Sequence, residues 1–173
     1  QMCIRDRPAS ALTALDTMPE LRQRIFAEPL IERALIPGIP SLGVITDITS
    51  IKVRRQYENN PYPRWVRAHV RPEPISADTI FKQGALKFLP EIALNLDNPE
   101  ILIAGCGTGQ HAIESAATWR GSKLLAVDIS LASLSYAKRK TSELNLENID
   151  FLHADILDLR SLNRDFDIVE CVG

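Results

Sequence analysis

The stretch from Ile101 to Gln110, ILIAGCGTGQ, places three glycines at alternate positions directly after four apolar residues. Glycine in or beside regular structure costs about 0.5–1 kcal/mol relative to alanine, so three within five residues indicate that something approaches the main chain there. The apolar run predicts a buried strand, and the residues that follow predict a helix. Ligands of parallel α/β sheets bind beyond the carboxyl ends of the strands. Gly105, Gly107 and Gly109 are therefore candidate ligand-binding residues.

From Ser76 onward, apolar runs typical of strands alternate with segments of helical spacing. Strands are predicted at 101–104, 122–128, 149–155 and 166–172, and helices at 76–90, 110–120 and 131–145. Ser76 and Ser130 are expected to cap the helices that follow them. Continuous apolar strands separated by helices are typical of a parallel sheet covered on both faces. The predicted fold class is α/β.

Three further segments precede this region. Residues 1–7 contain MCIRDR, which resembles the translated remnant of a sequencing adapter, and we expect them to lie outside the fold. Residues 8–55 are predicted to be a helical linker, in which Pro19 opens one helix and Pro29 starts or kinks another. Residues 56–75 contain two X-Pro pairs that favour extended backbone, which predicts an extended Tyr/Pro/Trp connector. Residues 76–173 form the ligand-binding domain.

Asp128 ends the second predicted strand, nineteen residues after Gly109. An acid at about this distance binds the hydroxyls of a ribose. A helix-capping role is the competing interpretation, but Ser130 already supplies a cap. The dinucleotide fingerprint is G-x-G-x-x-G, whereas Gln110 stands here where its third glycine would be. The closer G-x-G-x-G spacing suits a smaller group, such as the carboxylate and ammonium of an amino acid.

ILIAGCGTGQ, LLAVDIS and FLHADIL together resemble the first three motifs of class I S-adenosylmethionine-dependent methyltransferases. The resemblance covers 101–173 and implies a Rossmann-like sheet, of which the chain holds the first four of seven strands. It implies S-adenosyl-L-methionine as cofactor and methyl transfer to an unidentified acceptor. A catalytically inactive cofactor-binding module and an NAD-dependent oxidoreductase are the alternatives.

The same resemblance implies roles for particular residues. The three glycines, with Cys106 and Thr108 between them, would line the methionine part of the cofactor. Asp128 would bind the ribose, and Ile129 would pack on the adenine. Asp155, with Ile156 beside it, would accept from the adenine amino group; a capping or turn role is the alternative. Many members carry an acid where this chain has Ile103, so contacts to the ammonium must come from elsewhere.

The connector carries a second, narrower resemblance. QYENNPYPRW and EPLIERAL are similar to a bacterial group whose methyltransferase domain follows tetratricopeptide repeats. This implies a fragment truncated at both ends and a protein partner bound through the absent repeats. Tyr57, Tyr62 and Trp65 are expected to anchor the connector in the core. Contact with the cofactor or substrate is the alternative for these three residues.

Composition limits the remaining function classes. The 173 residues carry a net charge of −2, which gives no general attraction to nucleic acid or anionic membranes. No apolar run reaches the roughly 20 residues that a membrane span needs. Three cysteines fit neither a disulfide framework nor a zinc site, which favours a cytoplasmic protein without a metal.

Catalytic residues are not assigned by the sequence. Cys106 and Cys171 are expected to be small packing residues. His111 and His153 are candidate bases without an assigned role, and Glu170 is expected to edge the pocket. Lys138, Arg139 and Lys140 are expected to form a solvated basic run.

Overall fold

The structure is a computed structural model that describes residues 18–84 and 96–172. Its helical elements and strands, in chain order, are α2 (Pro19–Arg22), η2 (Gln23–Ala27), α3 (Glu28–Leu35), η3 (Ile36–Gly38), α4 (Ile48–Asn59), α5 (Ala77–Gln83), β1 (Glu100–Ala104), α7 (Gln110–Thr118), β2 (Lys123–Asp128), α8 (Leu131–Glu143), β3 (Ile149–His153), η4 (Ile156–Leu162) and β4 (Ile168–Glu170). The expectation for residues 1–7 and the part of the predicted helix over residues 85–90 fall outside the described residues.

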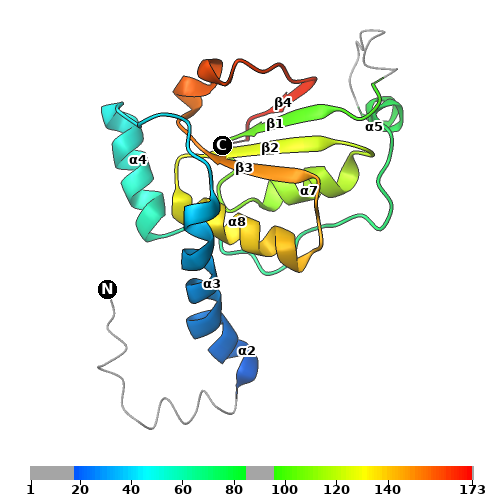
Figure 1. Cartoon of the computed structure of the whole chain (residues 1–173). Coiled ribbons are helices and arrows are strands. Elements are labelled where there is room, and N and C mark those ends of the chain that lie inside the picture. The colour runs from blue at the N-terminus through cyan, green and yellow to red at the C-terminus, as the bar shows by residue number, and fades with distance from the viewer. Residues whose placement is uncertain (1–17, 85–95, 173) are drawn as a thin grey trace, which may run out of the picture.

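The four strands form one parallel sheet in the order β3-β2-β1-β4 (Figure 1). Ile101 of β1 lies opposite Leu124 of β2 on one side and Ile168 of β4 on the other. The chain therefore builds outward from β1 to β3 and then returns to the other side of β1. This reversal creates a topological switch point at the carboxyl end of β1, the usual ligand position in such sheets. The α/β prediction is confirmed.

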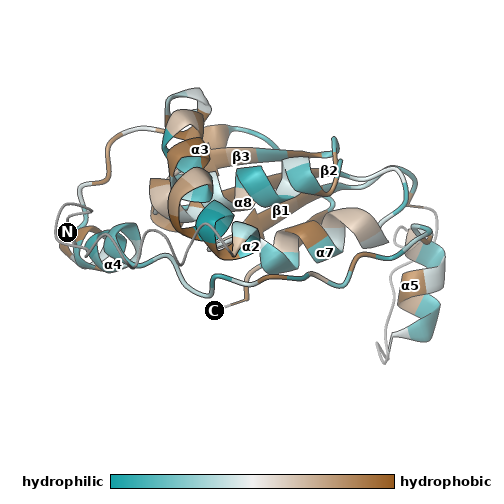
Figure 2. Ribbon diagram, turned by 90° about the horizontal axis from the view of Figure 1, so that it is seen from below, coloured by the Kyte–Doolittle hydropathy of each residue, from teal (hydrophilic) through white to brown (hydrophobic). Residues whose placement is uncertain are grey.

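Alternate side chains of the strands enter two different cores. Ile101 and Ile103 are buried beneath α7 and α8, which cover the same face of the sheet (Figures 1 and 2). Leu102 and Val127 point to the other face, where Leu159 and Leu162 of η4 pack against them. The glycine turn at the end of β1 is thus supported from both faces.

Side-chain caps define where three helices begin. Asp47 accepts a hydrogen bond from Ser50 N at 2.8 Å at the start of α4. Ser76 accepts from Thr79 N at 3.3 Å, and Ser130 accepts from Ser133 N at 3.1 Å. Each oxygen satisfies a backbone N–H of the first turn that has no partner within the helix. The caps expected at Ser76 and Ser130 are confirmed.

The N-terminal helical run is continuous from Pro19 to Leu35 but contains a π-helical segment at η2. Pro29 lies just beyond this segment and has no N–H to donate to the carbonyl four residues earlier, which explains the local change of helix type. After η3 the chain runs along the edge of the sheet. Leu42 N donates to His153 O and His153 N donates to Pro40 O, both at 2.9 Å. These bonds pair with the open edge of β3.

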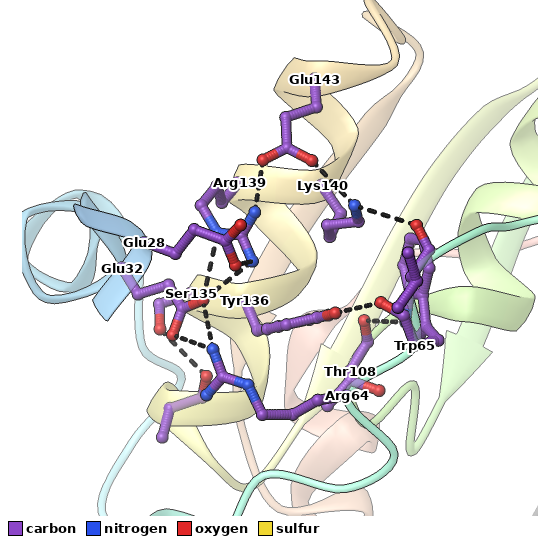
Figure 3. Close-up of polar contacts among 12 residues, drawn as sticks. Glu28, Glu32, Arg64, Trp65, Thr108, Ser135, Tyr136, Arg139, Lys140 and Glu143 are labelled. Carbon is purple, nitrogen blue, oxygen red and sulfur yellow. Dashed lines mark hydrogen bonds and ion pairs between the residues drawn. The ribbon is translucent and has the colours of Figure 1, made fainter. Parts of the chain in front are cut away.

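A buried ion-pair cluster fastens α3 to α8 (Figure 3). We call it the Arg139 network; its members are Glu28, Glu32, Arg64, Arg139 and Glu143. Arg139 is only 4% exposed, and its guanidinium lies 2.9 Å from Glu28 and 3.0 Å from Glu32. Glu32 also pairs with Arg64 at 2.8 Å. The expectation of a solvated basic run at 138–140 was therefore wrong for Arg139, because acids of a helix distant in sequence surround it.

Several element boundaries differ from the predicted ones. The connector begins at Asn60 rather than residue 56, because α4 continues to Asn59 and ends just before Pro61, where the helical conformation is disfavoured. The third strand ends at His153, and Asp155 belongs to the turn that follows it. The fourth strand is limited to Ile168–Glu170.

Candidate functional site

The glycine turn joins β1 to α7 in a conformation that suits glycine. Gly105, Gly107 and Gly109 have φ values of +76°, +53° and +80°. Residues other than glycine rarely adopt these values. The turn is fixed to the neighbouring strand because the N–H groups of Gly105 and Cys106 both donate to Val127 O at 2.9 Å. The backbone of the turn is thus held at the carboxyl end of β2.

The first two glycines leave open space beside the backbone. A Cβ atom added at Gly105 or Gly107 would meet no other atom within 4 Å. A ligand can therefore approach the main chain at both positions. Gly109 differs, because its Cβ would lie 2.5 Å from Cβ of Ala137 on α8. Gly109 allows α7 and α8 to pack closely, and it does not line the cavity described below.

The Asp128 carboxylate bridges the glycine turn and the start of α8. Its Oδ2 accepts a hydrogen bond from Gly107 N at 2.7 Å, and its Oδ1 accepts from Ser130 N at 2.9 Å. Burial raises the pKa of Asp128, and the hydrogen bonds from Ser130, Gly107 and Ile129 oppose this change. The carboxylate therefore faces the turn, as a ribose-binding role requires.

A cavity of about 660 Å³ lies between the glycine turn and the ends of β2 and β3. This volume is in the range of small-molecule and cofactor sites. Of the nine sequence-predicted cofactor residues, eight line it: Gly105, Cys106, Gly107, Thr108, Asp128, Ile129, Asp155 and Ile156. The fold thus gathers residues from three separate β-strand ends around one space. Their roles toward a ligand stay predictions.

Asp155 has a structural role in addition to its place on the cavity. Its Oδ1 accepts from Leu157 N at 3.0 Å and caps η4, which is the alternative role considered for it. The neighbouring Ile156 is 50% exposed, so an apolar side chain is available at the cavity wall. A capping role does not exclude an adenine contact, because a carboxylate accepts several hydrogen bonds.

One wall of the cavity is supplied by α4, of which the sequence interpretation named only Tyr57, as the alternative to a core role. Thr49, Ser50, Val53 and Tyr57 of this helix line the cavity, together with Tyr62 of the connector. None of the α4 side chains is buried in the protein. A clear apolar stripe along this helix would have indicated that one of its faces lines a site. The apolar residues of this segment are spaced too irregularly to form such a stripe.

Glu58 fastens the α4 wall to the domain. Its Oε2 accepts from Ser130 Oγ at 2.9 Å and from Ala132 N at 2.8 Å, at the N-terminus of α8. A carboxylate is favourable at this position because the helix end carries partial positive charge. The linker therefore takes part in building the cavity.

Only one of the three connector aromatics is a core anchor. Trp65 is 8% exposed, and its Nε1 donates to Thr108 O in the glycine turn at 3.0 Å. Tyr136 of α8 donates from its hydroxyl to Trp65 O (Figure 3). Tyr57 and Tyr62 are 38% and 75% exposed, so the core-anchor expectation was wrong for them. Both rings line the cavity, which is the alternative considered for them.

The cysteines are not placed as nucleophiles. Burial, together with the charge of Asp128, raises the pKa of the Cys106 thiol well above its usual value, which keeps it protonated. Cys106 is buried as expected, whereas Cys171 is exposed, so the packing role expected for Cys171 was wrong.

The two histidines differ in their surroundings. His111 lines the cavity, and its Nε2 lies 2.7 Å from Glu170 Oε2. His153 instead hydrogen-bonds Ser41 Oγ and Ile129 O through its two ring nitrogens, at 3.0 Å each. His153 therefore connects the linker segment to the loop after β2, and its ring nitrogens are occupied.

Across residues 18–84 and 96–172, no helix is long and apolar enough to cross a membrane.

Comparison with known proteins identifies the type of domain. Residues 101–173 match the family described as Methyltransferase domain. An uncharacterized protein of Rickettsia prowazekii is 31% identical over 117 residues, which cover 68% of this chain and 44% of the relative. A release factor glutamine methyltransferase of Rhodopirellula baltica is 30% identical over 160 residues, which cover 91% of this chain and 50% of the relative. The chain thus spans half or less of the length of these curated relatives.

Similar solved structures cover parts of the chain. PKMT2 from Rickettsia typhi in complex with AdoHcy has a TM-score of 0.41 at 30% identity, covering 44% of this chain and 15% of that one. A magnesium protoporphyrin IX methyltransferase from Synechocystis with bound SAM has a TM-score of 0.47 at 23% identity, covering 75% and 64%.

The bare glycine turn, the facing carboxylate and the cavity between them fit an adenosyl amino acid. Gly105 and Gly107 leave open space beside the main chain, and Asp128 presents a buried carboxylate that is hydrogen-bonded to Gly107 N. Residues 101–173 thus match the family described as Methyltransferase domain, and the glycine turn, Asp128 and Asp155 of the cavity all lie within this match.

Proposed function

We propose that the protein transfers a methyl group from S-adenosylmethionine to an acceptor that remains to be identified. The observation that carries this proposal is the 2.7 Å hydrogen bond from Gly107 N to Asp128, made at the wall of a cavity of about 660 Å³. The bond shows that the carboxylate and the turn backbone reach the same point. When bound, the cofactor supplies a methyl carbon on a sulfonium, which is a good leaving group.

The cavity walls suggest how the cofactor is held. The backbone from Gly105 to Thr108 would receive its amino-acid part, and Asp128 would accept from the ribose hydroxyls. Ile129 and Ile156 would enclose the adenine, and Asp155 would accept from the adenine amino group. Gly109 would support this arrangement from behind, since it sets the distance between α7 and α8. Positioning of the reacting groups is the main contribution expected of the protein.

Calorimetry of cofactor binding tests the proposal. S-adenosylmethionine and S-adenosylhomocysteine are expected to bind, and NAD is not. Hydrogen bonds to a charged group contribute about 1.5–3 kcal/mol, so Asp128→Asn is expected to raise the Kd about 10- to 100-fold. Asp150→Asn, on the exposed side of β3, is the matched control and is expected to leave the Kd unchanged. Equal Kd values for the wild-type protein and a folded Asp128→Asn variant would contradict the ribose assignment.

The raised pKa of Asp128 predicts a pH dependence of binding. The ribose hydroxyls donate to the ionised carboxylate, and protonation removes one acceptor oxygen. Because burial raises the pKa of Asp128, affinity is expected to decline on acidification before the usual range for aspartate is reached. Calorimetric titrations at stepwise lower pH would measure the decline. The affinity of the Asp128→Asn variant is expected not to decline in this way. An identical pH profile in both proteins would contradict the assignment of the pH dependence to Asp128.

The wider assignments stay proposals. The likeness of the linker and connector to proteins with tetratricopeptide repeats suggests a protein partner, and the unpaired cysteines suggest a reducing, cytoplasmic compartment. Neither the partner nor the compartment affects the assignment of the cavity as the cofactor site. The α4 wall and the tyrosines line the cavity without an assigned cofactor contact, so the acceptor would lie beside them.

A further inference from the structure

His111 and Glu170 form a pair at the edge of the cavity that cofactor binding does not use. His111 belongs to the first turn of α7, and Glu170 is the last residue of β4. His111 Nε2 and Glu170 Oε2 are 2.7 Å apart, a distance typical of a charge-assisted hydrogen bond. Only His111 lines the cavity, and its side chain is 45% exposed. The His111 ring thus lines the cavity, whereas the Glu170 carboxylate contacts the ring without lining the cavity.

Glu170 is itself held in place. Ser115 Oγ, one turn further along α7, donates to the two carboxylate oxygens at 3.2 and 3.0 Å. The buried Ser115 and the ring of His111 therefore fix the carboxylate from the same helix. A carboxylate oriented in this way is available as a fixed acceptor for the imidazole.

The pair determines which ring nitrogen of His111 carries the proton. An ionised carboxylate only accepts hydrogen bonds, so Nε2 must be the donor. In the neutral ring, Nδ1 then bears the lone pair. Within the described part of the chain, Nδ1 has no hydrogen-bond partner. In the neutral ring, this free nitrogen is available at the cavity to accept a proton.

The topology places this base opposite the residues proposed to hold the adenosine. Asp128 and Asp155 follow β2 and β3, on one side of β1, whereas β4 pairs with the other side of β1. If the residues after β2 and β3 hold the ribose and adenine, the switch point between β1 and β4 would be left for the reacting groups. His111 and Glu170 lie at that point, where an acceptor has to meet the methyl group.

We propose that His111, oriented by Glu170, is the general base of the methyl transfer, which rests on the proposed function above. The lone pair of the acceptor atom forms a bond to the methyl carbon while the carbon–sulfur bond breaks and leaves its electron pair on sulfur. The acceptor proton moves to His111 Nδ1, and the resulting imidazolium is stabilised by Glu170. The acceptor is thus a group whose nucleophilic atom carries both a lone pair and a proton, such as a hydroxyl or a neutral amine. Glu170 is a positioning residue.

Nuclear magnetic resonance of the imidazole nitrogens tests the pair directly. In the ligand-free protein, His111 is expected to be the Nε2–H tautomer with a protected Nε2 proton, assigned by its loss in His111→Gln. Glu170→Gln replaces a charged acceptor by a neutral one and is expected to weaken the hydrogen bond from Nε2 by about 1.4 kcal/mol. The Nε2 proton should then exchange with water about tenfold faster. An Nδ1–H tautomer, or an exchange rate independent of Glu170, would overturn the proposal.

Two cofactor analogues test the position of His111. Sinefungin carries an amine where the transferred methyl group lies, whereas S-adenosylhomocysteine has nothing there. The Nδ1 resonance of His111 is expected to shift more with sinefungin than with S-adenosylhomocysteine, while that of His69, on the connector, responds alike to both. Equal shifts of His111 would place the ring away from the reacting centre and refute the inference.

The two proposals can fail separately. If neither analogue binds by calorimetry, the proposed function fails, yet the tautomer measurement in the ligand-free protein still reports on His111 and Glu170. If both bind and His111 does not distinguish them, the cofactor assignment stands and the base is elsewhere. Thermal unfolding of Glu170→Gln verifies that the variant is folded before either result is used.

Discussion

Replacement of Gly109 by alanine is expected to destabilise the protein by about 2–5 kcal/mol, one of the largest effects of any substitution in the domain. Two costs add at this position. The backbone has a φ of +80°, which disfavours any residue with a Cβ, and the new Cβ would lie 2.5 Å from Cβ of Ala137. Since both atoms belong to short, rigid side chains, α7 or α8 has to move. Chemical denaturation measures the change in unfolding free energy.

Gly107→Ala is the matched control. Its φ of +53° carries a similar backbone penalty, but the added Cβ meets no atom within 4 Å. We therefore expect a loss of only about 1–2 kcal/mol, together with weaker cofactor binding because the methyl group enters the cavity. If Gly107→Ala and Gly109→Ala lose the same stability, the close approach of α7 and α8 is not what requires glycine at 109.

Arg139→Met is expected to cost about 3–5 kcal/mol, because it removes the buried cation that Glu28, Glu32 and Glu143 share, and Glu32 then keeps only its pair with Arg64. Burial alone would lower the pKa of Arg139, but the carboxylates of Glu143, Glu28 and Glu32 raise it, so the side chain is charged in the fold. Methionine keeps the apolar stem and removes the charge. The measurements are denaturant unfolding and hydrogen exchange of the α3 amides, which are expected to exchange faster as α3 loosens.

Lys138→Met serves as the control for Arg139→Met. Lys138 precedes Arg139 on α8, but its Nζ reaches only the carbonyl of Gly38 at 3.1 Å in an exposed position. A change within about 0.5 kcal/mol is expected, as for most surface substitutions. Equal destabilisation by the two variants would show that the Arg139 network contributes no more than a surface contact.

Local sequence patterns predicted the central part of the fold well. The apolar run from Ile101 to Ala104, followed by alternate glycines, predicted β1, the turn and α7. Ser130 predicted the start of α8 because a capping hydroxyl acts within its own first turn. These features depend on residues that are close in the chain, so the sequence exposes them directly.

Boundaries and burial were predicted less well where distant segments decide them. Arg139 lies in a run of three basic residues and looks solvated, but acids of α3 bury it. Tyr57 and Tyr62 look like core residues, but Trp65 docks on Thr108 and leaves both rings at the cavity. The partners in each case are more than thirty residues away, and no local pattern records them.

The sequence by itself determined the α/β alternation, the glycine turn and the acid at the end of the second strand, because backbone conformation and strand periodicity are properties of adjacent residues. Only the tertiary structure decided that Gly109 lets two helices pack closely, that Glu58 fastens α4 as a cavity wall, and that His111 meets Glu170. Each of these contacts joins elements that are far apart in the chain. Parallel strand pairing and the docking of the linker bring these elements together, and a local sequence pattern does not record the distance between them.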